Sequence, residues 1–319
     1  MPTLDFVQTT PLAASITQDG KRLDSLLLRY PRMVHADFMT HRVFSRNASS
    51  SRAIPLKKML LDEPYVPLFR ENKPGMQPGD YLSNADQEAA EAIWMEMADA
   101  VRAGVAKLGL PRGEGGLNIH KQWVNRATEW FGYISVVVSA TDWINFLTLR
   151  DDAGAQDEIQ TLARRIKADL YAQTPRLLRP GEWHLPFINL EEDIDTISRF
   201  LRNERAQADY NLGLIDFAFV NLREVSEIDR LLIVSSASRC ARASYRDFDG
   251  SKASITRDVG TFLKLAASQP VHASPLEHQA RAARPGAALT KAHQGNFRGF
   301  QQFRKFVPGE AVWDAPAAN

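Results

Sequence analysis

Twelve consecutive residues, His41 to Arg52, bring together side chains that are well suited to binding an anion. They include three arginines and five small hydroxyl or amide side chains, and Ser/Asn-rich backbone bends expose N–H groups. Guanidinium groups form charge-assisted, often bidentate hydrogen bonds with phosphate. We therefore expect this segment to hold the phosphate of a nucleotide. A solvated turn with capping serines is the plainer alternative.

The residues that precede this segment, 33–39, read as a short strand. The anion-binding segment is then expected in a loop that leaves the end of a strand. Loops carried by a rigid sheet are common locations for functional sites.

The spacing of the segment resembles the signature loop of the flavin-dependent thymidylate synthases. That family reads Arg-His-Arg, seven residues and Ser, and usually continues through Ser-x-Asn-Glu-x-Ser-x-Arg-Tyr. The chain departs from this pattern at Thr40, Ala48 and Ala53, where relatives have Arg, Glu and Tyr. The residues that match in place are His41, Arg42, Ser45, Asn47, Ser50 and Arg52.

Residues 139–150, followed by 155–159, resemble a second block of the same family. Asn145 and Arg150 match in place, and the resemblance implies that the Asn contacts flavin and the Arg contacts the pyrimidine nucleotide. Ser139 and Thr141 replace an Asn and an Arg that touch flavin in relatives. On a helix, Asn145 and Arg150 lie about 140° apart around the axis, so they need not serve one ligand. For Arg150, a helix C-terminal cation favoured by the macrodipole is an equally plain interpretation.

Two further blocks, 239–245 and 272–278, resemble the family strings Arg-x-Ala-Arg-Val-Ser-Tyr and His-x-Ser-Pro-Phe-Glu-His. The second predicts a helix start with Ser274 as N-cap, Pro275 at the first position and Glu277 at the third. His272 and Ser274 are then candidate flavin contacts. Relatives place both blocks before the signature loop, and moving 228–306 in front of Met33 restores that order. A circular permutation is the simplest explanation.

The stretch 299–305 resembles the Gln-x-Phe-Arg-His sequence that precedes the signature loop in relatives. This similarity raises the hypothesis that Arg304 supplies the cation missing at Thr40.

The resemblance implies reductive methylation of dUMP at C5, with methylenetetrahydrofolate as one-carbon donor and FAD carrying hydride from NADPH. It implies homotetramers with active sites between subunits. Cys240 has no neighbouring base that would make it a nucleophile, which leaves Arg150, Arg52 and the flavin to polarise the pyrimidine ring. We expect Arg150 and Ser50 to be catalytic. The expected substrate contacts are Arg52, Ser50, Ser49, Arg150 and Arg126. The expected cofactor contacts are His41, Arg42, Asn47, Asn145, His272, Ser274, Glu277 and Arg304.

The changes at Ala48 and Ala53 leave other functions open. One is a different C5 reaction on the same fold, such as hydroxymethylation or an action on dCMP. Another is a non-catalytic homologue that binds flavin or nucleotide.

The composition describes an ordinary globular protein. The chain has 319 residues, 44% of them hydrophobic, and a formal charge of +1, which argues against a nucleic-acid or anionic-membrane partner. The N-terminus has no signal-peptide pattern, and no apolar run is long enough to span a bilayer, so we expect a cytoplasmic protein. A single cysteine excludes an intrachain disulfide, and scattered histidines predict no metal site.

The hydrophobic periodicity predicts an α+β fold, a mixed or antiparallel sheet flanked by helices with the blocks in permuted order. We expect one intertwined domain made of segments 1–179 and 228–319, with 180–227 as an insertion or linker. In the helix at 84–108 we expect capping by Asn84 or Asp86, and Ile93, Met97, Val101 and Val105 to recur on one face. Thr141 and Asp142 should cap the helix that carries Arg150. Further helices are predicted at 118–130, 155–172, 191–203, 228–245 and 254–267, strands at 134–138 and 296–306, and a frayed end at 315–319.

Overall fold

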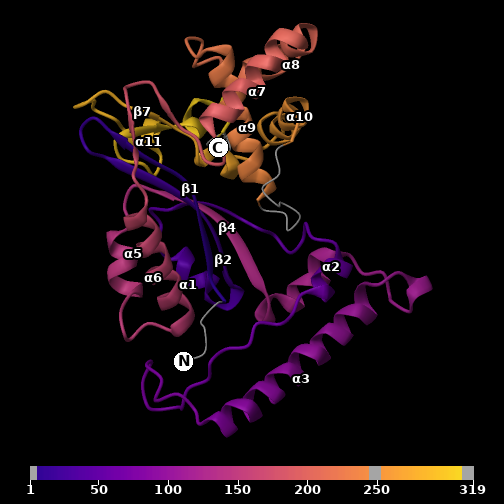
Figure 1. Cartoon of the computed structure of the whole chain (residues 1–319). Coiled ribbons are helices and arrows are strands. Elements are labelled where there is room, and N and C mark those ends of the chain that lie inside the picture. The colour runs from indigo at the N-terminus through magenta and orange to yellow at the C-terminus, as the bar shows by residue number, and fades with distance from the viewer. Residues whose placement is uncertain (1–5, 244–252, 311–319) are drawn as a thin grey trace, which may run out of the picture.

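A five-stranded sheet forms the centre of the protein (Figure 1). The structure, a computed structural model, describes residues 6–243 and 253–310. The strand order is β3-β4-β2-β1-β5. Strands β1 (Gln8–Thr17) and β2 (Arg22–Pro31) form an antiparallel hairpin, and its turn contains Gly20 at φ 78°, a backbone conformation that favours glycine. β4 (Tyr133–Ala140) and the edge strand β3 (Ser45–Ala48) continue the antiparallel pairing, whereas β5 (Arg176–Leu178) is parallel to β1.

One face of this sheet is covered by α5 (Ile144–Arg150), α6 (Asp157–Ala172) and the short α1 (His35–Met39) (Figure 1). Alternate residues of β2 and β4 face these helices, among them Leu28 and Val136, which are fully buried. Ile159, Leu162 and Ile166 of α6 face the sheet, as their spacing predicts. The apolar side chains of the strands, two residues apart, and those of α6, three or four residues apart, therefore pack in one layer.

A second layer packs on the other face of the sheet. It contains α7 (Leu190–Asn203), α8 (Arg205–Ile215), α9 (Glu227–Arg242) and α10 (Ile255–Ala266). It also contains a small sheet of β6 (Trp183–His184), β7 (Ala280–Ala282) and β8 (Phe300–Gln302). Cys240 and Ala243 at the end of α9 pack against Val137 of β4. Side chains from 183–222 share one apolar core with those from 231–307.

A chain of buried hydrogen bonds joins the two layers. His278 Nδ1 lies 2.9 Å from the Ser139 hydroxyl, which bonds the Ser25 hydroxyl. Ser25 Oγ lies 2.8 Å from His184 Nε2, and His184 Nδ1 lies 2.9 Å from Ser15 Oγ. Burial lowers the pKa of both imidazoles to about 3, so both rings are neutral at physiological pH.

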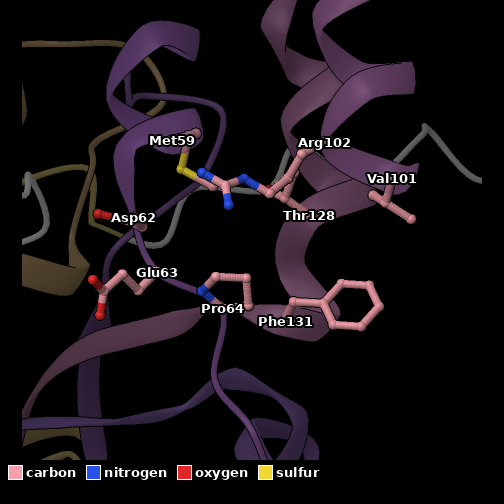
Figure 2. A pocket seen from close by; sticks show the side chains of 9 residues that line it. Met59, Asp62, Glu63, Pro64, Val101, Arg102, Thr128 and Phe131 are labelled. Carbon is pink, nitrogen blue, oxygen red and sulfur yellow. The ribbon is translucent and has the colours of Figure 1, made fainter. Parts of the chain in front are cut away.

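Residues between β3 and β4 make a long excursion away from the sheet. They form α2 (Leu56–Leu61), α3 (Asn84–Gly109), η2 (Arg112–Glu114), α4 (Lys121–Val124) and η3 (Asn125–Phe131), and α3 lies at the periphery (Figure 1). Figure 2 shows a pocket of about 20 Å³ between α2, α3 and η3, room for about one water molecule, with Arg102 reaching across from α3. The Arg102 guanidinium donates to the carbonyl of Leu60. One side of α3 is thereby attached to the rest of the molecule.

The remaining elements are short turns of helix around the sheets. They are η1 (Arg32–Val34), η4 (Asp216–Phe219), η5 (Ser274–Glu277), η6 (Phe303–Phe306) and α11 (Lys291–Gln294).

The α+β class with mixed sheets and flanking helices is confirmed, but the strand prediction at 33–39 is wrong. Those residues are helical in η1 and α1, because β2 ends at Pro31 and the chain turns back so that Phe38 packs on Tyr30. The strand predicted at 296–306 is limited to β8. Phe303 and Phe306 lie in the helical turn that follows, which explains why the aromatic residues alternate imperfectly.

The predicted helices exist, except that 118–130 contains only the short α-helix α4 followed by the 3-10 helix η3, and three further details differ. Ser83 caps α3 by accepting a hydrogen bond from the Asp86 amide, in place of Asn84 or Asp86. Ile93 and Met97 of α3 are 60% and 46% exposed, so the predicted apolar face does not face the core throughout.

Thr141 and Asp142 do not cap α5, which begins at Ile144. Both instead contact Arg298: Thr141 Oγ1 accepts from its amide at 3.0 Å, and Asp142 lies 3.2 Å from its guanidinium. Part of the helix predicted over 228–245, the part beyond 243, lies outside the described residues. The segment 315–319, predicted to be frayed, lies outside them too. The division into 1–179, 180–227 and 228–319 stays a prediction.

Candidate functional site

The predicted anion-binding segment is built around an edge strand rather than a free loop. Residues Ser45–Ala48 form β3 against β4, and Ser49 continues the pairing with its amide 2.8 Å from the Ser135 carbonyl. Because side chains alternate along a strand, the segment has two faces. Ser45, Asn47, Ser49 and Ser51 are buried, whereas Arg46, Ala48 and Ser50 are half-buried and Arg52 is exposed.

The buried face of β3 meets the late part of the chain. Asn47 Nδ2 donates to the Cys240 carbonyl at 2.8 Å, and Ser274 Oγ donates to Asn47 Oδ1 at 3.2 Å. Cys240 belongs to the third block of the sequence and Ser274 to the fourth. Asn47 therefore connects three of the four blocks.

Ser45 extends this contact to the region of Arg304. The Gln302 amide donates to Ser45 Oγ at 2.9 Å and to the Glu277 carbonyl at 2.8 Å. Burial raises the pKa of Glu277, an effect opposed by the ion pair with Arg304. Arg304 also pairs with Glu310 at 2.5 Å. This guanidinium is neutralised by two carboxylates, and the cation that contacts Thr40 is a different one.

That cation is Arg150, on the opposite face of the sheet. Its Nε donates to His41 Nε2 at 3.3 Å, its Nη2 lies 3.5 Å from Thr40 Oγ1, and Asp37 Oδ1 is 3.9 Å away. Asn145 hydrogen-bonds His41 as well, so the two α5 residues converge on one imidazole despite their angular separation. Desolvation and then the Arg150 charge lower the pKa of His41, which leaves its ring neutral.

His41 is held in place by aromatic neighbours. Its ring packs edge-on against Phe146, with centroids 4.9 Å apart, and stacks on Phe44 at 5.9 Å. Only 6% of its surface is exposed. The neutral ring can therefore orient Arg150 but presents little surface to a ligand.

Two predicted cations remain available at the solvent edge of the segment. Arg42 and Arg52 are exposed, and neither forms an ion pair within residues 6–243 and 253–310. The nearby hydroxyls differ in availability: Ser49 Oγ accepts from the Ser135 amide at 3.1 Å, and Ser51 bonds Glu129. Ser50 is half-buried and is the hydroxyl closest in sequence to Arg52 that is free to meet a phosphate.

Two expected contacts, Arg126 and His272, do not join this hydrogen-bond network in the described part of the chain. Arg126 is exposed on η3, next to Asn125, whose amide donates to the carbonyls of Ser51 and Ile54. His272 is exposed, and its amide bonds the Leu265 carbonyl. In the described part of the chain, neither side chain bonds another predicted site residue. Ser274 lies at the start of η5, but Ala273 occupies the N-cap position and no side chain caps this turn, contrary to the capping prediction.

The sequence interpretation missed a cavity of about 370 Å³ beside Ser49, on the sheet face opposite α5 and α6. Arg29 lies 3.9 Å above the ring of Tyr133 in its wall, and burial lowers the pKa of that guanidinium. The alternation of Arg29 with buried leucines in 22–31 could have indicated its place on a strand face. The cavity is lined by Gln8, Thr10, Leu27, Arg29, Ser49, Asp62, Tyr133 and Ser135.

Residues 25–176 match the protein-family model described as thymidylate synthase complementing protein. This part of the chain, just under half of it, is therefore similar to the flavin-dependent thymidylate synthase family. The match runs from β2 to β5 and so includes β3, His41 and α5. The blocks at 239–245 and 272–278 lie outside it, and Ser244 and Tyr245 of the first are also outside the described residues. No curated protein sequence matches the chain.

Solved structures of related enzymes show similarity over about half of the chain. The UMP/dUMP methylase PolB from Streptomyces cacaoi, bound with 5-Br UMP, is 18% identical, with a TM-score of 0.41 over 51% of this chain and 88% of its own. Thymidylate synthase X from Helicobacter pylori, with FAD and dUMP, is 18% identical, with a TM-score of 0.32 over 46% of this chain and 65% of its own.

Proposed function

We propose that this protein transfers a methyl group reductively to C5 of dUMP, with methylenetetrahydrofolate as one-carbon donor and FAD and NADPH as redox cofactors. The observation that carries the proposal is the hydrogen bond from Arg150 to His41. It joins the two blocks that lie inside the family match, 41–52 and 139–150, into one charged site.

The substrate phosphate would bind at the exposed edge of β3. Arg52 offers a guanidinium without a carboxylate partner in the described chain, and Ser50 offers a hydroxyl two residues earlier in the sequence. Charge-assisted hydrogen bonds of this kind contribute about 1.5–3 kcal/mol each. Ser49 and Arg126 would be weaker contacts of the phosphate. The Ser49 hydroxyl already bonds the Ser135 amide, and Arg126 bonds no other predicted site residue in the described chain.

Arg150 would stabilise the pyrimidine ring as it becomes nucleophilic. C5 of dUMP reacts only when negative charge can develop on the ring, and a preorganised cation beside a carbonyl oxygen supports that charge. The Arg150 side chain is 23% exposed, and its Nε is fixed by His41, so its remaining N–H groups can face a ligand. Thr40 Oγ1 and Asp37 restrict the same guanidinium from the other side.

Covalent activation by a thiolate is disfavoured. Cys240 is fully buried, and burial raises the pKa of its thiol well above the usual range. Activation by cations in place of a nucleophilic cysteine is therefore the mechanism that this chain supports.

The residues around β3 suit a flavin dinucleotide in their chemistry. Arg42 is an exposed cation for a phosphate group, and Asn145, His272 and Ser274 offer exposed polar groups for ring edges. Asn47 and His41 are buried and Glu277 is half-buried, and all three would position these groups through the contacts described above. When bound, FAD supplies hydride transfer from the nicotinamide to the one-carbon unit. Arg304 would act on this site through Glu277.

We also propose that the late segment 228–306 takes the place of the chain that precedes the signature loop in relatives, as in a circular permutation. Support comes from the hydrogen bonds of Asn47 with Ser274 and the Cys240 carbonyl, and from that of Gln302 with Ser45. Regions far apart in sequence thereby meet on β3.

The proposal includes a homotetramer and a cytoplasmic location, both taken from the family resemblance. None of the described helices combines the length and the apolar character that a membrane-spanning helix requires.

A second candidate is a different C5 reaction, such as hydroxymethylation, or an action on dCMP. Ala48 and Ala53 favour it, because relatives carry Glu and Tyr at these two positions next to the expected phosphate site. A non-catalytic flavin- or nucleotide-binding homologue would keep the binding residues and lose turnover.

Flavin binding is the first test. The purified protein, supplied with FAD and desalted, should retain a flavin absorbance band, and Arg42→Ala should lower FAD affinity. A protein that takes up no FAD would refute the enzyme proposal in both forms.

A further inference from the structure

Helix α3 carries an apolar stripe that faces solvent. Ile93, Met97 and Leu108 are 60%, 46% and 43% exposed, and Ala100 and Gly104 between them are also exposed. The first four follow one another at intervals of four, three and four, the alternation of a coiled-coil seam, and Leu108 lies four residues further on the same side of the helix. At 26 residues, α3 is about 39 Å long.

The stripe is distinct from the side of α3 that packs on the protein. The packing side contains Ala98 and Val105, which are buried, and Trp94, whose indole N–H donates to the Tyr65 carbonyl at 2.8 Å. Arg102 reaches from this side into the pocket of Figure 2. No other described element lies over the outer side of α3 in Figure 1.

We propose that this stripe pairs with the same stripe of a second copy of the chain, with the two α3 helices antiparallel. Pairing Met97 with Gly104 of the second copy also pairs Ile93 with Leu108 and brings Ala100 to the two-fold axis. A Cβ built at Gly104 meets nothing within 4 Å, so this glycine leaves room for the partner's methionine. A two-fold interface of this kind is closed and self-complementary.

The charges beside the stripe select the antiparallel arrangement. Glu96 and Lys107 lie on the same flank of the stripe, both exposed, and neither forms an ion pair within residues 6–243 and 253–310. Same flanks meet in an antiparallel pair, so Glu96 of each copy lies beside Lys107 of the other. In a parallel pair opposite flanks meet, so Glu96 and Lys107 would not lie beside each other.

The apolar surface continues past the end of the helix. The amides of Leu117 and Ile119 bond the carbonyls of Lys107 and Leu108, at 2.9 and 2.8 Å, which aligns this segment with the last turn of α3. Leu117 and Ile119 are 53% and 42% exposed. In the proposed pair they lie near the N-terminal half of the partner helix and enlarge the buried area.

Light scattering of the full-length protein after size-exclusion chromatography tests this interface. The wild type should have a mass that is a multiple of 35.8 kDa, and Met97→Glu should halve it. Gly104→Gln should do the same, although it improves helix propensity and its Cβ would have no heavy atom of its own chain within 4 Å. Tyr171→Glu, at an 82% exposed site on α6, is the matched control and should leave the mass unchanged.

A charge reversal tests the orientation. Lys107→Glu should weaken association about tenfold, and the double variant Glu96→Lys/Lys107→Glu should restore it. Circular dichroism and thermal unfolding check that each variant is folded. A monomeric wild type at micromolar concentration, or an unchanged mass in both Met97→Glu and Gly104→Gln, would overturn the proposal. Failure of the double variant to regain association would overturn the antiparallel register.

Discussion

Arg150 Nε donates to His41 Nε2 at 3.3 Å, so a cation at the end of α5 is oriented by a neutral imidazole from the signature segment. The Nε2 atom must be unprotonated to accept this bond, which fixes the proton on Nδ1. The contact makes Arg150 a directed donor in place of a mobile surface charge. It also places the cation beside Thr40, the position at which the family sequence pattern has an arginine.

Replacing Arg150 should therefore remove activity without unfolding the protein. Arg150→Ala should lower kcat about 100- to 1000-fold, the usual effect of losing one preorganised donor to a developing charge. Because the Arg150 charge lowers the pKa of His41, the variant should also raise that pKa, measurable by NMR titration. Arg164→Ala is the control: it removes an exposed α6 side chain that pairs with Asp151. This variant should leave kcat and the pKa of His41 unchanged. Unchanged turnover in Arg150→Ala would exclude its assigned role.

Arg52 should act on the phosphate alone. Arg52→Ala should raise KM for dUMP about 10- to 150-fold, which corresponds to the loss of one charge-assisted hydrogen bond of about 1.5–3 kcal/mol. Binding of deoxyuridine, which lacks the phosphate, should be unaffected. Lys57→Ala, at another exposed cation, is the control. Equal losses for dUMP and deoxyuridine would show that Arg52 does not bind the phosphate.

The buried pair of Arg239 and Asp193 should be essential for stability. Arg239 Nη1 and Nη2 each lie 2.9 Å from an Asp193 oxygen, and the two side chains are 4% and 2% exposed. Asp193→Asn removes the nearest countercharge of a buried cation, whose Nε lies 3.9 Å from Asp258, and should cost about 3–5 kcal/mol in urea unfolding. Asp195→Asn removes an exposed pair with Arg199 on the same helix and should cost about 0–1 kcal/mol. Similar costs for both variants would contradict this description of the core.

The buried histidines predict a loss of stability in acid. The folded pKa values of His184 and His278 are about 3, far below the unfolded value of 6.5. The unfolded chain therefore binds protons first as the pH falls below 6.5, and each ring costs about 1.4 kcal/mol per pH unit until the folded pKa is reached. Asp258 opposes this trend, because its folded pKa of about 6 exceeds the unfolded 3.8 and its protonation favours the folded state.

A variant isolates the histidine contribution. His184→Gln keeps a polar side chain at this position of the chain of hydrogen bonds and removes one titrating group. Urea titrations between pH 6.5 and about 5 should show a smaller stability loss in His184→Gln than in wild type, by about 2 kcal/mol. The same loss in both proteins would mean that His184 is not held neutral.

Much of the fold follows from local sequence pattern. The spacing of Ile159, Leu162 and Ile166 places α6 on the sheet correctly, and the apolar run at 134–138 marks the interior strand β4. The hairpin of β1 and β2 was missed, although Asp19-Gly20 between two apolar stretches is a common hairpin signal. In 45–51, buried serines and Asn47 alternate with half-buried residues, which is the two-residue period of a strand. The prediction of a loop for this segment overlooks that period.

The site needed tertiary information. Sequence spacing identified His41, Asn145 and Arg150 as candidates, but a helical wheel separates the last two and cannot show that His41 lies between them. For Arg304 the sequence similarity predicts a cation beside Thr40. In the structure Arg304 is instead paired with Glu277 and Glu310. Pairing between distant ion partners depends on the packing of η5 and η6, and no local pattern encodes it.

The most direct test of the proposed function is release of tritium from C5-labelled dUMP. The full-length protein is incubated with FAD, NADPH and methylenetetrahydrofolate, and labelled dCMP is assayed in parallel. The account predicts tritium release from dUMP together with formation of thymidylate, dependent on FAD and lost in Arg150→Ala. Flavin-loaded protein that releases no tritium from dUMP would contradict it.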